Sequence, residues 1–157
     1  MKSGVLMIIH IYAKVSICKM PVIMSNKHYT CPFSHLILSG RCGCAFSAKD
    51  CIAEKEFGAC LDESASGDCA SLYQNLRSNS DFALKSHHQS NLSVGQQAKI
   101  KMGGLLALQE IIHQSSENNI KDIATLVEKI KSKYANFDKL PFSKLMPKIS
   151  QFKFRVR

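Results

Sequence analysis

The sequence lacks the short motifs that identify the common nucleotide-dependent and zinc-dependent enzymes. It has no G-x-x-x-x-G-K-[ST] phosphate-binding loop, no G-x-G-x-x-G dinucleotide fingerprint and no H-E-x-x-H helix. The order of Cys, His and Asn typical of cysteine proteases is also absent, as is any carboxylate pair placed for acid–base catalysis. We therefore expect a protein that is not an enzyme.

Long apolar runs are missing as well, and none approaches the roughly 20 residues that a membrane-spanning helix needs. Residues 1–23 have the basic start and short apolar run of a signal peptide, but His10 interrupts the run. Lys14 and Lys19 then occupy a region that should be neutral before a cleavage site. We expect a cytoplasmic protein whose residues 1–29 form a leader or flexible arm. Export is the alternative, if residues 1–23 are a signal peptide.

Acidic residues are scarce at both ends of the chain. Residues 1–30 contain four lysines and no acid, and residues 118–157 contain ten basic and three acidic residues. Residues 31–117 hold seven basic and nine acidic residues. The net charge of +9 therefore comes from the two ends, and an acidic partner would meet the C-terminal end first.

The seven cysteines follow none of the standard signatures. There is no C-x-x-C redox motif, and the close cysteine pairs of zinc fingers and the ferredoxin run are also absent. An odd number of cysteines leaves one thiol outside any complete set of disulfides. Thiolates are soft ligands for zinc and for iron–sulfur clusters, so we expect one of these two cofactors. The candidate ligands are Cys31, Cys42, Cys44, Cys51, Cys60 and Cys69.

The tightest cysteine pair is Cys42-Gly-Cys44, in a turn that contains glycines. The simplest local ligand set is Cys31 with this pair. Either Cys51 or His35 would complete the set of four that a structural zinc site requires.

Cys60 and Cys69 lie further along the chain. If Cys31, Cys42 and Cys44 bind a metal with Cys51 or His35, then Cys60 and Cys69 would form a second site or a disulfide. In the alternative, one of them joins Cys31 and the tight pair around an iron–sulfur cluster, because eight-residue connections reach roughly 26 Å. Cys51 and Cys69 also fall on helical stripes, where a cysteine can simply pack as a small apolar residue. These interpretations stay open from the sequence alone.

Apolar residues recur at helical spacing in four segments. Ser47-Ala-Lys-Asp50 has a capping-box outline, which predicts a helix over about 47–58. Further helices are predicted over about 68–85, from the capping box at Ser93 through the run AKIKMGGLLALQEIIH, and over about 119–135. Gly103-Gly104 lies inside the third of these helices and indicates either a kink or, in our interpretation, close packing against another backbone.

The expected fold class is mostly α, a small four-helix domain with a Cys-rich N-terminal loop and a basic C-terminal tail. The single helical domain covers residues 30–137, with a Cys-rich half at 30–85 and a Cys-free half at 92–137. Residues 138–157 form the tail, whose alternating ending SQFKFRVR is typical of an edge strand or a disordered segment. Candidate contacts to an acidic partner or nucleic acid are Lys148, Phe152, Lys153, Phe154, Arg155 and Arg157.

Two functions follow from these observations. The first is a metal-binding accessory protein that carries an iron–sulfur cluster or structural zinc on its cysteine cluster. The second is a helical protein-interaction module, with buried or disulfide-bonded cysteines and a basic tail for an acidic protein or nucleic acid. Convergence of at least four thiols in the fold would favour the first function.

Overall fold

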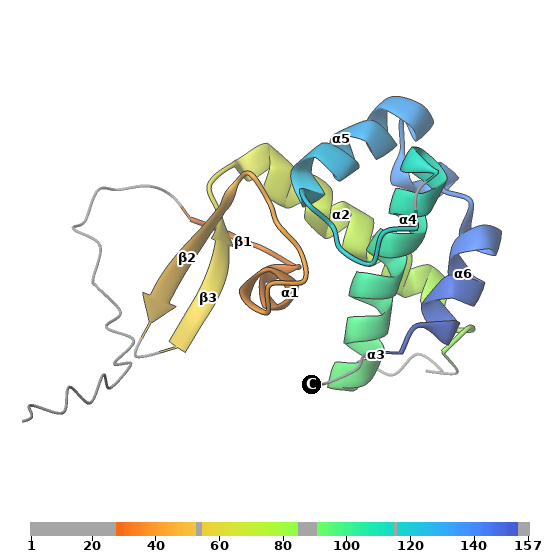
Figure 1. The fold of residues 1–157 in the computed structure, drawn as a ribbon, viewed down its shortest axis with the longest axis horizontal. Coiled ribbons are helices and arrows are strands. Elements are labelled where there is room, and N and C mark those ends of the chain that lie inside the picture. Colours follow the sequence, from red (N-terminus) through yellow and green to blue (C-terminus); the bar gives the residue numbers. More distant parts are fainter. Residues whose placement is uncertain (1–27, 53–54, 85–90, 115, 154–157) are drawn as a thin grey trace, which may run out of the picture.

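The computed structural model describes residues 28–52, 55–84, 91–114 and 116–153, apart from the side chains of residues 51 and 52. A small sheet stands at one end of a body of packed helices (Figure 1). The prediction of a mostly helical protein is confirmed. In the described part of the chain, no helix is long and apolar enough to cross a membrane. Of the leader or arm expected at residues 1–29, only the last two residues belong to that part.

The sheet has three strands in the order β1-β3-β2, and a short helix packs on it. These elements are β1 (Tyr29–Thr30), α1 (Ser34–Leu38), β2 (Ser47–Ile52) and β3 (Lys55–Cys60). The central strand β3 is antiparallel to both neighbours, and Cys60 stands opposite both Tyr29 and Ser47. A Cβ added to Gly58 would lie 3.0 Å from the Cβ of Ser34, so the glycine lets α1 approach the strand closely.

The β2–β3 hairpin replaces the helix that the sequence predicted over residues 47–58, and that prediction was wrong. Ile52 pairs with Lys55, which makes the connection between the strands very short. Asp50, expected to cap the helix, instead lies 2.6 Å from Nδ1 of His28. The last three residues of β3 are all buried. Pairing on both sides of this strand outweighs the local capping signal, because strand formation depends strongly on tertiary context.

The remaining elements are helical. They are α2 (Glu63–Ser80), α3 (Val94–Ala98), the π-helical turn η1 (Lys99–Gly103), α4 (Gly104–His113), α5 (Ile123–Tyr134), the 3₁₀ turn η2 (Phe137–Lys139) and α6 (Phe142–Gln151). The three helices predicted after residue 60 are therefore present. The capping box at Ser93 and Gln96 is confirmed. α2 begins earlier than predicted because the Asp62 carboxylate accepts a hydrogen bond from the N–H of Ala65 at 2.7 Å.

The glycines between η1 and α4 are sites of close packing, as the sequence predicted. A Cβ added to Gly103 would lie 3.2 Å from the Cα of Ile149, and one added to Gly104 would lie 2.8 Å from a methyl group of Leu76. Helices α6 and α2 therefore approach this point from two sides. The π-helical turn of η1 sits at the same place, where the helix also changes its backbone geometry.

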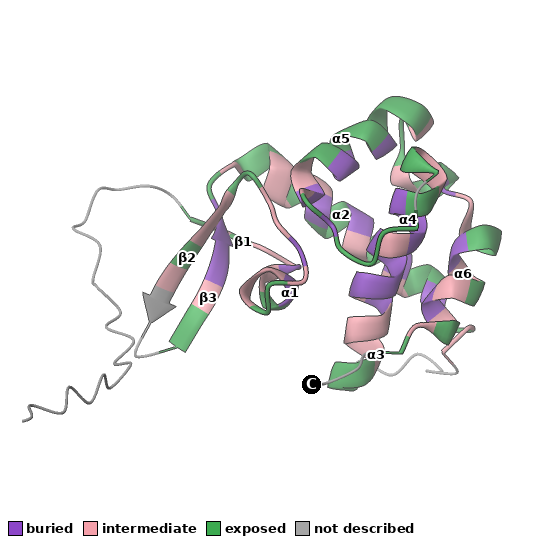
Figure 2. Ribbon diagram, viewed as in Figure 1, coloured by how far each residue is buried: buried purple, intermediate pink, exposed green. Residues whose placement is uncertain are grey.

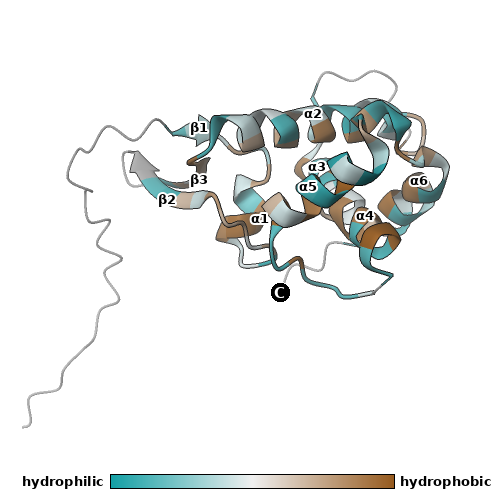
Figure 3. Ribbon diagram, turned by 90° about the horizontal axis from the view of Figure 1, so that it is seen from above, coloured by the Kyte–Doolittle hydropathy of each residue, from teal (hydrophilic) through white to brown (hydrophobic). Residues whose placement is uncertain are grey.

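Helix α6 was not predicted, although its residues contribute to the core. Leu145 and Ile149 are fully buried, and Pro147 is tolerated inside the helix. Buried residues lie on β3 and on the inward faces of the helices (Figure 2), and hydropathy follows the same division (Figure 3). Of the four helices expected from the sequence, the first is a hairpin in the structure, and α6 is an additional helix that was not expected. The boundary expected at residue 138 stays a prediction.

Candidate functional site

The sheet is joined to the helical body through a short loop around Gly43. The N–H of Gly43 donates to the carbonyl of Ile120 at 2.8 Å, and the carbonyl of Gly43 accepts from the N–H of Ile123 at 2.9 Å. A Cβ on Gly43 would overlap the carbonyl oxygen of Lys121. This close backbone approach positions the two cysteines that flank Gly43.

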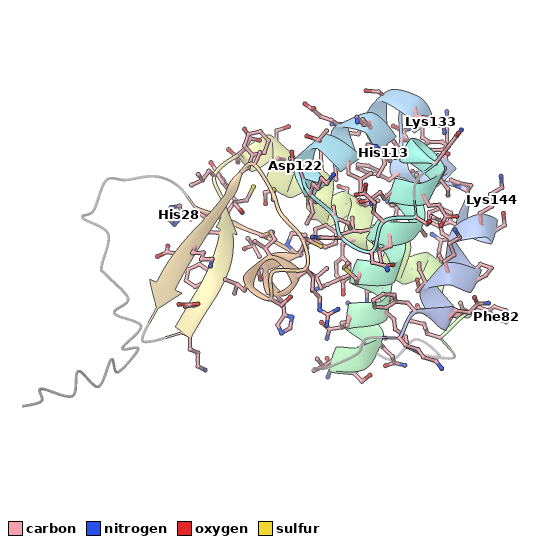
Figure 4. All side chains as sticks on the ribbon, viewed as in Figure 1. His28, Phe82, His113, Asp122, Lys133 and Lys144 are labelled. Atoms are coloured by element: carbon pink, nitrogen blue, oxygen red, sulfur yellow. The ribbon has the colours of Figure 1, made fainter. Side chains whose placement is uncertain are left out.

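Asp122 completes the same junction and lies at the N-terminal end of α5 (Figure 4). Its carboxylate accepts from the N–H of Ala124 within α5 and from the N–H of Ala45 in the loop, the latter at 2.9 Å. The hydroxyl of Thr125 donates to it at 2.5 Å. Burial alone would raise the Asp122 pKa, but these hydrogen bonds outweigh it and hold the pKa below its ordinary value. One carboxylate therefore caps a helix and anchors the cysteine loop.

Four cysteines come together beside this junction from four separate segments. Cys31 directly follows β1, Cys44 precedes β2, Cys60 ends β3 and Cys69 lies in α2. Cys60 and Cys69 are buried, whereas Cys31 and Cys44 are partly exposed. We call these four residues the thiol cluster.

The electrostatics of Cys69 show that the cluster members are neighbours. Burial, followed by the negative charges of Cys31, Cys44 and Cys60 in that order, raises the pKa of Cys69 to about 12. These charge effects indicate that the three other sulfurs lie near Cys69, because the interaction between two charges falls with their separation. Cys69 therefore favours its protonated, neutral thiol.

Cys31 and Cys44 experience opposing influences. Burial raises the pKa of both thiols, and the N–H of Phe33 lowers that of Cys31. For Cys44, the N–H groups of Phe46 and Ala124 act in the same lowering direction, while the charge of Asp122 raises the pKa. Backbone donors that point at these sulfurs can stabilise thiolates once a cation is bound.

Lys101 is a residue near the cluster that sequence reasoning missed. Its Nζ lies 4.9 Å from the ring centre of Tyr73, and its positive charge lowers the pKa of Cys31. Burial lowers the pKa of Lys101 itself, and the charge of Cys31 raises it. No sequence signal links Lys101 to Cys31, because 70 positions separate them along the chain.

Cys42, expected among the ligands, is placed apart from the cluster. Its Sγ lies 3.6 Å from Sδ of Met102, and its side chain is 5% exposed. Burial raises the pKa of Cys42 to about 12, against a lowering by the charge of Arg41. No other described cysteine acts on its charge, so Cys42 has the environment of a core residue.

The other predicted site residues are not placed in the thiol cluster by the described part of the structure. Cys51 lies in β2 opposite Glu56, but its side chain is outside the description, as is the whole of Cys18. His35 is exposed on α1. Within the described ranges, no disulfide joins the cysteines, and no three His, Cys, Asp or Glu side chains are already arranged around a common metal position.

The basic C-terminal residues are partly engaged within the fold. Lys148 forms an ion pair with Glu110, and Phe152 packs against Gly103. Lys153 is exposed, while Phe154, Arg155 and Arg157 lie beyond the described residues.

Comparisons with known proteins give no match from which a function could be assigned. No protein-family model matches the chain, and neither a curated protein nor a solved structure is significantly similar to it.

Proposed function

We propose that the protein is a metal-binding protein, and that the thiol cluster of Cys31, Cys44, Cys60 and Cys69 holds the metal. The observation that carries the proposal is that Cys31, Cys44 and Cys60, from three other chain segments, lie near enough to Cys69 for their charges to raise its pKa, while Cys42 packs elsewhere. Four thiolates are the ligand set of a closed structural zinc site. The proposed set thus keeps Cys31 and Cys44 and replaces Cys42 by both Cys60 and Cys69.

The electrostatics of the cluster support a bound cation. Burial and mutual repulsion raise the pKa of Cys69 to about 12, and the same two influences raise that of Cys31. A divalent cation removes the repulsion and binds only the deprotonated thiols, so binding releases protons. The thiols need to rotate toward a common centre, since Zn–S bonds are about 2.3 Å long.

A route to the cluster from solvent is available. A cavity of about 420 Å³ between α2 and α5 includes Cys69, Phe46 and Val127 in its wall. Asp62 and Glu128 line the same cavity, together with Asp68, which is paired with Lys131 at 2.7 Å, so the charged groups of the wall sum to a negative charge that favours the approach of a cation.

The role of the metal would be structural. The cluster joins β1, the loop before β2, the end of β3 and the helix α2, so one ion would cross-link the sheet to the helical body. A closed four-thiolate site has no open position for a substrate. We therefore propose zinc as the ion, and an iron–sulfur cluster is the other outcome of the test below.

The test is anaerobic purification of the full chain, followed by metal analysis and an absorption spectrum. We expect about one zinc per chain in the wild type and in Cys42→Ala, and less than about half of that in Cys69→Ser. Visible absorption with bound iron would identify an iron–sulfur cluster instead. A colourless protein with neither metal contradicts the proposal, as does loss of metal in Cys42→Ala alone.

A second candidate function is an interaction module for an acidic partner. The charge distribution favours it, because residues 118–153 contain eight lysines and three acidic residues. Lys133 and Lys144 lie on the side of the molecule away from the sheet (Figure 4). Such a surface attracts an acidic protein or nucleic acid through long-range electrostatics.

A further inference from the structure

The strand β1 and the helix α2 contact each other in a regular series. The hydroxyl of Tyr29 donates to the carboxylate of Glu63 at 3.0 Å. One residue further along the strand, the carbonyl of Thr30 accepts from the hydroxyl of Ser66 at 2.9 Å. The two contacts are one residue apart in the strand and three residues apart in the helix.

Cys31 follows Thr30 by one residue along the chain, and Cys69 follows Ser66 by three residues in α2. Residues 63, 66 and 69 are spaced by three along α2, so they lie on one face of the helix. Cys69 is buried and Cys31 is partly exposed, and both are free thiols. Besides burial, the charge of Cys31 is the strongest of the three cysteine influences on the pKa of Cys69.

We propose that Cys31 and Cys69 form a disulfide when the protein is oxidised, as a covalent bridge between β1 and α2. A disulfide requires Cα atoms about 4.4–6.8 Å apart. The Thr30–Ser66 hydrogen bond of 2.9 Å holds the backbone next to Cys31 directly on α2, three residues before Cys69. The sequence spacing alone does not favour this pair, because 37 residues separate the two cysteines.

The oxidation balances with a peroxide or with glutathione disulfide. The two S–H bonds of Cys31 and Cys69 break, and one S–S bond forms. The two electrons and two protons released by the thiols reduce one molecule of hydrogen peroxide. Two thiols and one peroxide thus give one disulfide and two waters. With glutathione disulfide as the oxidant, the products are the protein disulfide and two molecules of glutathione.

The bridge itself does not require a metal, but its effect on a metal rests on the proposed function. A disulfide removes two of the four proposed ligands, so oxidation would release a bound zinc ion. Reduction would restore the site.

The test is peptide mapping of the full chain after oxidation with glutathione disulfide. Remaining thiols are alkylated in denaturant, and the protein is cleaved with trypsin and with a protease specific for glutamate. The sequence then places Cys31 in peptide 28–41, Cys60 in 57–63 and Cys69 in 64–77. We expect the linked peptides 28–41 and 64–77 as the main cross-linked product. The Cys42→Ala variant should give the same product, and Cys69→Ser should not.

Two results would overturn the inference. One is a dominant link from peptide 28–41 to 42–49 or 57–63. The other is full alkylation of Cys31 and Cys69 after the remaining cysteines have been oxidised. Zinc is measured separately on the reduced protein, so a bridge without zinc contradicts only the metal proposal. Zinc without the bridge contradicts only the disulfide.

Discussion

Cys42 illustrates how the environment of a single residue determines its chemistry. In the sequence it belongs to the tightest cysteine pair, which made it a candidate ligand. In the fold its sulfur packs against Met102, while Cys44, two residues away, turns toward the thiol cluster. Gly43 allows this divergence because its backbone lies directly on the carbonyl of Lys121.

The burial of Cys42 predicts a loss of stability at alkaline pH. Its pKa rises from an ordinary 9.0 to about 12 in the folded protein, so above pH 9.0 the unfolded chain holds fewer protons than the native state. A group of this kind stabilises the fold below its unfolded pKa, and the contribution is lost as the pH rises toward the folded value. The loss approaches at most about 1.4 kcal/mol per pH unit.

The measurement is urea unfolding of the reduced protein at a series of pH values above 9.0. Cys42→Ala lowers the stability at neutral pH through lost packing, but its stability should fall less steeply with pH than that of the wild type. Parallel pH curves for the two proteins would show that Cys42 does not titrate in this way.

At the scale of elements, the contact of α6 with η1 is the least expected feature. Helix α6 packs where Gly103 exposes the backbone, and its Ile149 lies over this glycine. The sequence predicted close packing at Gly103 but not the helix that provides it. Pro141 and Pro147 argue locally against a helix at this point. In the structure, Pro141 directly precedes the first residue of α6.

Replacing Gly103 with leucine should destabilise the protein by about 1–3 kcal/mol, because the added side chain would overlap α6. Gly67→Leu in α2 is the matched control, since a Cβ there meets nothing within 4 Å. The control should be neutral or slightly stabilising, because leucine favours helices more than glycine does. Denaturant unfolding of both variants provides the comparison. Equal stability of the two would refute close packing of α6 on Gly103.

At the scale of the whole molecule, the part that contains the sheet and α1 is held to the helical body by a small number of groups. Cys60 ends β3, Cys31 and Cys44 lie in the segments that connect the strands and α1, and α2 carries Cys69. Asp122 and the backbone around Gly43 attach this part to α5. A metal or a disulfide at the cluster would reinforce the same connection.

The whole-molecule charge makes the second candidate function testable. We expect the full chain to bind a single-stranded oligonucleotide in fluorescence anisotropy, with affinity that falls as salt rises, because lysine contacts release counterions. The double variant Lys133→Glu, Lys144→Glu should weaken binding, and Lys55→Glu on the sheet is the control. Binding that is unaffected by either salt or the double variant would exclude this surface. Truncation from residue 148 is a poorer test because it removes the buried Ile149.

The sequence by itself determined the helical class, the three helical segments predicted after residue 60 and the capping box at Ser93. These features depend on local periodicity and on interactions within a few residues. Only the tertiary structure decided that residues 47–60 form a hairpin, because β3 gains its partners from β1 and β2 together. It also decided which cysteines meet. Cys44 and Cys69 are 25 positions apart in the chain, and spacing along a sequence does not specify proximity across a fold.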